Sequence, residues 1–66
     1  MTPFDKIKLK AHLKVIQETA GNILYEMDND KEFPRKENYD SVNSIIHSAG
    51  KVNEILNSKS NTHADR

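Results

Sequence analysis

Two apolar stripes with heptad spacing constrain the fold of this chain more than any other feature. One stripe follows residues 9–27 and the other follows residues 42–56, both in alternating steps of three and four. Such spacing places apolar side chains along one face of a helix that packs lengthwise against another helix. The sequence therefore predicts an all-α protein with two helices and an oligomer seam. The seam residues are Leu9, Leu13, Ile16, Ala20, Ile23, Met27, Val42, Ile45, Ala49, Val52 and Leu56.

Capping and turn signals predict the limits of the two helices. Thr2 is suited to cap the first helix, Pro3 to its first position and Asp5 to a side chain that reaches back to the cap. The dipeptide Phe33-Pro34 ends any helix that precedes it. The predicted elements are a helix over about 3–28, a turn over about 29–35 and a helix over about 36–58, all within one domain 1–58 that precedes a flexible tail 59–66. So short a turn makes the pair an antiparallel hairpin.

Small residues lie near the middle of both predicted helices. Antiparallel pairing about a turn centred at 34–35 sets Ala20 beside Ala49, which predicts a layer of close helix approach. Alternatively, Gly21 and Gly50 each end a helix, which would produce three or four short helices. Both stripes continue in phase across the glycines, so we expect two unbroken helices.

A chain of 66 residues is short for an independent helical hairpin. Two helices in contact along one stripe bury little apolar surface, and without cysteine no disulfide adds stability. We therefore expect self-association into a homodimeric four-helix bundle or a larger helical oligomer, or association with a partner. This architecture resembles that of Rop, a small plasmid-encoded hairpin that modulates RNA and forms an antiparallel four-helix bundle. The likeness is one of architecture and transfers no site residue.

Charges balance overall but are segregated along the chain. Residues 1–14 carry four lysines against one aspartate, whereas residues 15–34 carry five acidic residues against one lysine. Uniform binding along nucleic acid or an acidic membrane needs a broad positive field, which this distribution does not provide. No apolar run approaches the roughly 18 residues of a membrane span. We expect a cytoplasmic protein without a membrane partner, in the host cytoplasm if a phage encodes it.

Catalytic and metal-binding patterns are missing from the sequence. His12 and His47 would lie roughly 15 Å apart along the hairpin, too far to share a metal whose ligand bonds are about 2 Å. The acidic run over residues 26–32 lacks the spacing of a calcium-binding loop. Nucleophile motifs and glycine-rich phosphate loops are also missing. We therefore expect no enzymatic activity, no metal and no cofactor.

Two surfaces remain as candidate binding sites. Four apolar residues fall outside the stripes and form a candidate contact with a protein partner. These residues are Phe4, Ile7, Val15 and Tyr25. Lys6, Lys10 and Lys14 repeat every four residues and form a basic ridge suited to an anion or nucleic acid.

The favoured interpretation is a small non-enzymatic interaction protein of the type that phages and mobile elements carry. We expect it to bind a host macromolecule, most simply a protein, and to modulate it by inhibition. One alternative is a protein like Rop that binds RNA, or a phosphorylated small ligand, through the basic ridge. A further alternative is a structural subunit of a larger assembly.

Overall fold

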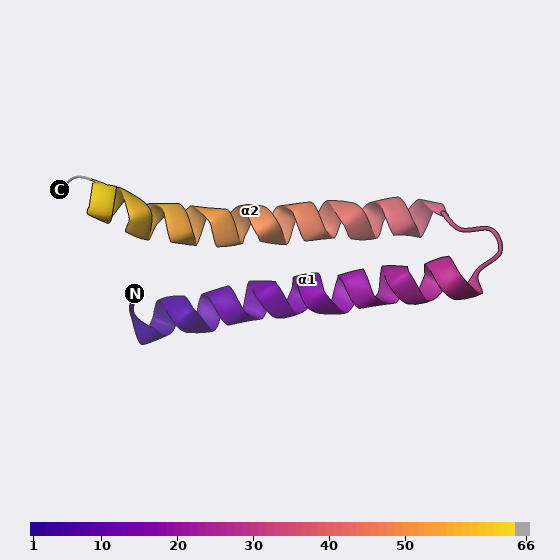
Figure 1. The fold of residues 1–66 in the computed structure, drawn as a ribbon, viewed down its shortest axis with the longest axis horizontal. Helices are drawn as coiled ribbons and strands as arrows, with labels where there is room; N and C mark the ends of the chain where they lie inside the picture. The colour runs from indigo at the N-terminus through magenta and orange to yellow at the C-terminus, as the bar shows by residue number, and fades with distance from the viewer. Residues whose placement is uncertain (65–66) are drawn as a thin grey trace.

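The computed structural model describes residues 1–64, and the side chains of residues 1–58, as two long helices joined by a short turn (Figure 1). Helix α1 spans Pro3–Asn29 and helix α2 spans Lys36–Ala64. The helices run antiparallel, so the N-terminus and the end of α2 lie together while the turn lies at the opposite end. This arrangement confirms the all-α antiparallel hairpin that the sequence predicts.

The start of α1 follows from the first five residues. Thr2 has an extended backbone, and its hydroxyl accepts a hydrogen bond from the Asp5 N–H at 3.1 Å. The Thr2 N–H in turn donates to the Asp5 carboxylate at 3.3 Å, and Pro3 occupies the first helical position. This capping box satisfies two backbone donors that would otherwise lack partners at the helix end.

Asp30 organises the turn between the helices. Its backbone N–H donates to the Glu26 carbonyl at 2.8 Å, and its own carbonyl accepts from the Phe33 N–H at 3.1 Å. Its carboxylate accepts from the Glu32 N–H at 3.0 Å and binds the Arg35 guanidinium at 2.5 and 3.1 Å. One aspartate therefore caps α1 and ties the turn to the residue before α2.

Helix α2 is longer than the sequence predicts. We expect an end near residue 58 and a flexible tail over 59–66, whereas α2 continues through Ala64. Because neither proline nor glycine occurs between Ser58 and Ala64, no residue there interrupts the helical backbone hydrogen bonds. Residues 65 and 66 of the predicted tail lie outside the described residues.

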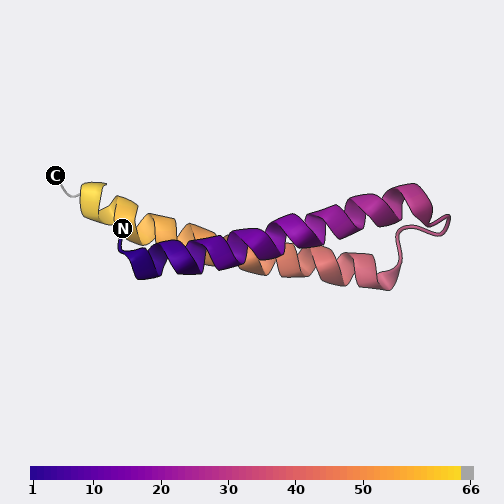
Figure 2. The same ribbon diagram turned by 90° about the horizontal axis from the view of Figure 1, so that it is seen from below.

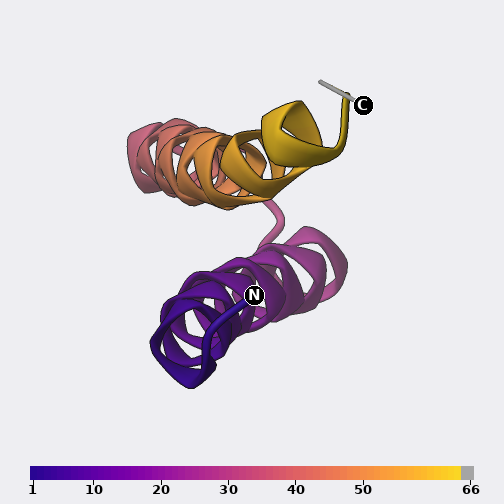
Figure 3. The same ribbon diagram turned by 90° about the vertical axis from the view of Figure 1, so that its left-hand side faces the viewer.

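The hairpin is a rod with extents of 53 × 20 × 14 Å. Its radius of gyration is 15.4 Å, compared with about 11 Å for a compact chain of this length. Figure 2 shows the two helices crossing at a shallow angle, and Figure 3 shows them end-on, with no third element beside them in the described part of the chain. Each helix therefore has one helical neighbour and covers only one of its faces.

The register of the helix pair differs from the predicted one. The side-chain amide of Asn38 donates a hydrogen bond to the Glu26 carboxylate, so these two residues lie at the same level. Both helices rise about 1.5 Å per residue, which places the centre of the hairpin near residue 32. The predicted pairing of Ala20 with Ala49 is therefore wrong. The centre of the helix pairing lies two to three residues before positions 34–35, on which that predicted pairing was based, although the turn itself lies within the predicted range.

The interior of the hairpin is only partly apolar. In both helices the least exposed side chains recur every three or four residues and mark the faces in mutual contact. They include Leu9, His12, Ile16, Thr19, Ile23 and Glu26 of α1, and Asn38, Ser41, Ile45, Ser48, Val52 and Ile55 of α2. Half of these positions are polar. Among the described residues no apolar side chain is fully buried, and only Asn38 and Ser48 are, at 3% and 6% exposed.

Candidate interaction surface

The predicted seam divides into two groups in the structure. The first group is half-buried at the contact between the helices and consists of Leu9, Ile16, Ala20, Ile23, Ile45 and Val52. The second group is exposed and consists of Leu13, Met27, Val42, Ala49 and Leu56. The hairpin therefore uses only part of the apolar stripe to hold itself together, and the rest faces outward.

The exposed group forms one continuous surface, which we call the apolar face. Around the axis of each helix, the exposed apolar residues lie about a quarter turn away from the interior residues. The direction of this rotation is the same in both helices when each is followed from its N-terminus to its C-terminus. Because the helices are antiparallel, this shared sense brings both sets to the same side of the hairpin. The apolar face comprises Leu13, Leu24 and Met27 of α1 together with Val42, Ile46, Ala49 and Leu56 of α2.

Two members of the apolar face lie outside the predicted seam. Leu24 and Ile46 are each 61% exposed, and they are among the most exposed aliphatic side chains described. The signal for Ile46 is a second heptad series in α2, running through Val42, Ile46 and Ala49, beside the interior series that contains Ile45. The predicted seam combines residues of both series into one stripe, whereas α2 has two separate apolar contact lines.

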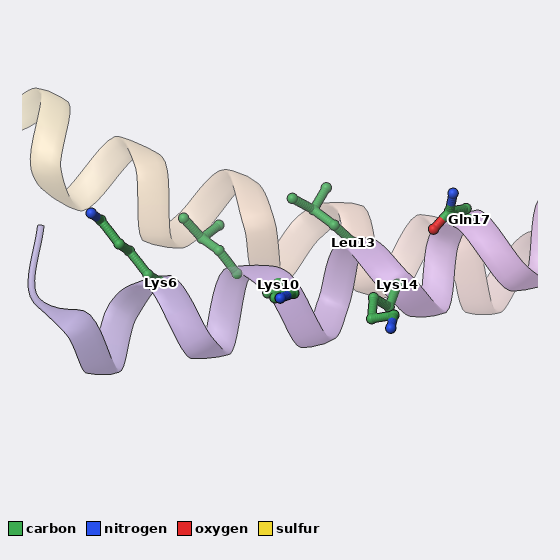
Figure 4. Close-up of a pocket in the computed structure, with 6 residues that line it drawn as sticks. Lys6, Lys10, Leu13, Lys14 and Gln17 are labelled. Carbon is green, nitrogen blue, oxygen red and sulfur yellow. The ribbon is translucent and has the colours of Figure 1, made fainter.

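An open groove with a volume of about 520 Å³ adjoins the apolar face near the N-terminal end of α1. Its lining residues are Lys6, Leu9, Lys10, Leu13, Lys14 and Gln17. Figure 4 shows Leu13 and Gln17 projecting to one side of α1 and Lys14 to the other, with Lys10 directed between them. The structure thus brings the three lysines of the basic ridge to one groove that also contains two leucines. Among the described residues, none of these lysine side chains forms an ion pair.

The predicted protein-contact residues are all exposed but do not form one cluster. They are Phe4, Ile7, Val15 and Tyr25. They spread along most of α1, outside both the interior of the hairpin and the apolar face. Phe4 also lies under the ammonium group of Lys8, whose Nζ is 5.5 Å from the ring centroid.

Asn38 joins three segments at the turn end of the hairpin. Its side-chain oxygen accepts from the Arg35 N–H at 2.6 Å, while its side-chain amide donates to the carboxylate of Glu26. The first bond satisfies a free donor at the start of α2, and the second crosses to α1. Sequence reasoning missed this link, because no local pattern indicates which residue of α1 lies opposite Asn38.

The ion pair in the turn shifts the titration of both partners. The hydrogen bond from Arg35 lowers the pKa of the Asp30 carboxyl, and the Glu32 N–H lowers it further. Asp30 correspondingly raises the pKa of the Arg35 guanidinium. The turn is therefore held by a carboxylate that favours its ionised form in the folded protein.

We expect acid to weaken the hairpin through Asp30. Because its pKa is lower when folded, the carboxylate stabilises the hairpin above the unfolded pKa of about 4, and this contribution disappears as pH falls through the folded value. Asp30→Asn keeps an oxygen for the Glu32 N–H but forms no ion pair. Its thermal midpoint should fall less than that of the native chain between about pH 5 and about pH 2, measured by circular dichroism. An equal fall in both proteins would exclude this role.

Neither other kinds of site nor comparison with known proteins gives a further indication of function. The described residues contain no group of three or more side chains arranged to hold a metal ion. Across the same residues, neither helix has an apolar segment long enough to cross a membrane. Comparison of the chain with family models, curated proteins and solved structures found no match. The surfaces of the hairpin are therefore the features that bear on function.

Proposed function

We propose that this chain is a small non-enzymatic interaction protein that dimerises through the apolar face and, as a dimer, binds and modulates another macromolecule. The observation that carries the proposal is the distribution of large apolar side chains. The apolar face holds six of them, as many as the half-buried interior of the hairpin. A helical pair that leaves half of its aliphatic residues in water gains little from folding alone.

The accessible surface of the hairpin supports a second copy on the apolar face. The chain exposes 5315 Å², whereas a compact monomer of 7.6 kDa exposes about 4300 Å². The difference is about 1000 Å², close to the roughly 800 Å² that each partner buries in a standard protein interface. One hairpin seated on the apolar face of another would bring the exposed area per chain into the usual range.

Sedimentation equilibrium over a dilution series, at low and high salt, tests the assembly. We expect a closed species of twice the 7.6 kDa chain mass that loses helicity as it dissociates. Helical monomers at every concentration would contradict the proposal. Assemblies that grow without limit would favour the alternative of a structural subunit.

The candidate protein contact remains exposed in such a dimer. Phe4, Ile7, Val15 and Tyr25 lie away from the apolar face, so dimerisation does not cover them. Substituting serine for both Ile7 and Val15 tests partner binding separately from dimer formation. The double variant should retain the mass and helicity of the dimer but lose capture of the partner. Unchanged capture would exclude this surface as the binding site.

A second candidate function is the binding of RNA or a phosphorylated ligand. It is favoured by the groove, where Lys6, Lys10 and Lys14 are free of ion pairs with the described residues. The ammonium groups of the groove can bind the phosphates of such a ligand, and the leucines beside them can contact a base or an apolar group attached to the phosphate. Binding of a labelled RNA should then fall steeply with salt and be lost in Lys10→Glu. Binding that does not respond to salt would exclude this function.

A further inference from the structure

We propose that the two hairpins of the dimer lie with their turns at opposite ends, with α1 beside α1 of the partner, about a two-fold axis near Gln17. The inference rests on the dimer proposed above and specifies its geometry. The occupant of the apolar face is a second copy of this chain. Three observations support the arrangement: the apolar face, the charges of the two ends, and the order of residues along the edge of α1.

A single apolar face permits two closed dimers with two-fold symmetry. In one, the axis runs along the helices, the turns share an end, and α1 packs beside α2 of the partner. In the other, the axis crosses the helices within the plane of contact, the turns lie at opposite ends, and α1 packs beside α1 of the partner. Neighbouring helices are antiparallel in both dimers, so helix direction alone does not choose between them.

The charges of the hairpin favour turns at opposite ends. The open end, residues 1–17 and 50–58, carries five lysines against two acidic residues. The turn end, residues 24–43, carries six acidic residues against three basic ones. Turns at the same end would bring like-charged ends together, whereas turns at opposite ends place each basic end beside an acidic one.

The edge of α1 that borders the apolar face is complementary in charge to the same edge of a second copy that runs in the opposite direction. Lys6 and Asp28 each lie eleven residues from Gln17, and eleven residues make about three helical turns. All three residues therefore lie along one line of α1. A two-fold axis at Gln17 sets Lys6 of each copy level with the partner's Asp28. Within the described residues neither side chain has an ion-pair partner in its own hairpin, so both are available to the second copy.

The groove on α1 receives an apolar side chain in this arrangement. The same axis places the partner's Leu24 level with Lys10, beside the groove leucines Leu9 and Leu13. Leu24 is 61% exposed in the single hairpin, and the alkyl stem of Lys10 can cover it while the ammonium group stays in water. Each copy thus fills the groove of the other.

Single cysteines test the geometry, because the native chain contains none. A disulfide needs Cα atoms within about 7 Å. Under mild oxidation Gln17→Cys should form a covalent dimer with native helicity, because the axis passes there. Lys31→Cys should remain uncrosslinked, because the turns lie at opposite ends of a rod 53 Å long. The mass of each reduced variant is measured in parallel by sedimentation.

The outcomes separate this inference from the proposed dimer. Crosslinking at residue 31 without crosslinking at residue 17 would show turns at the same end and overturn the inference while leaving the dimer intact. A reduced dimer that crosslinks at neither position would also overturn it. A reduced chain that is monomeric throughout would overturn the dimer itself, and the inference with it.

Charge exchange provides an independent readout of the same contact. Lys6→Asp and Asp28→Lys should each raise the dissociation constant of the dimer by about tenfold, because each places like charges together twice per dimer. The double variant restores opposite charges and should return close to the native value. Lys8→Asp is the matched control, since Lys8 lies over the Phe4 ring, away from the apolar face. Additive weakening in the double variant would overturn the pairing.

Discussion

Ile46→Asp is expected to abolish the dimer and most of the helical structure. In a lone hairpin this substitution would be mild, because Ile46 is 61% exposed and exposed positions tolerate exchange within about 0.5 kcal/mol. In the proposed dimer the aspartate is buried among apolar side chains without a partner, which costs several kcal/mol per copy. Sedimentation should show monomers, and far-ultraviolet circular dichroism should show a large loss of helix.

Ile7→Asp is the matched control for this experiment. Ile7 is 66% exposed, slightly more than Ile46, but it lies on the outer side of α1, away from the apolar face. The same chemical change there should leave mass and helicity unchanged. If both variants remain helical dimers, the apolar face is not the interface, and the exposed aliphatic residues need another explanation.

Asn38→Ala is expected to lower the free energy of unfolding by about 1–3 kcal/mol. Asn38 is the least exposed residue described, and its side chain makes one hydrogen bond within the start of α2 and one to Glu26 across the hairpin. Alanine removes both bonds and leaves the half-buried Glu26 carboxylate without this donor. Urea unfolding at fixed protein concentration measures the loss, because the stability of a dimer depends on concentration.

One further substitution shows which hydrogen bond of Asn38 matters more for stability, and another serves as a control. Asn38→Asp keeps an oxygen for the Arg35 N–H but places a carboxylate against Glu26, so a large loss would identify the contact between helices as the more important one. Asn43→Ala is the control, because Asn43 is exposed and alanine favours the helix. It should leave stability unchanged or slightly raise it. A similar loss in both alanine variants would mean that Asn38 has no special role.

The start of α1 and the ends of both helices at the turn were predictable, because local chemistry determines them. Thr2, Pro3 and Asp5 make a capping box whose three parts lie within four residues of one another. Pro34, which follows Phe33, prevents a helix from continuing through the turn before α2 begins. The predicted turn over residues 29–35 is one residue longer than the observed one, because α1 continues through Asn29 and α2 starts at Lys36.

The basic ridge was likewise accessible from the sequence. Its groove is lined by residues of α1 alone, so helical periodicity is enough to bring Lys6, Lys10 and Lys14 to one site. The apolar face was less accessible. It combines residues from both helices, and the two heptad series of α2 differ by only one position at Ile45 and Ile46. A one-position difference decides whether an isoleucine lies inside the hairpin or on its surface.

The sequence by itself determined two helices, the capped start of α1, the ends of both helices at the turn and, through a short connection, their antiparallel direction. These properties depend on side chains within a few residues of each other. Only the tertiary structure decided the register, because that depends on Asp30 closing the turn and on Asn38 reaching Glu26 twelve residues away. The register in turn determined which apolar residues the hairpin covers. It left Leu13, Leu24 and Ile46 exposed on the surface where we expect the second copy to bind.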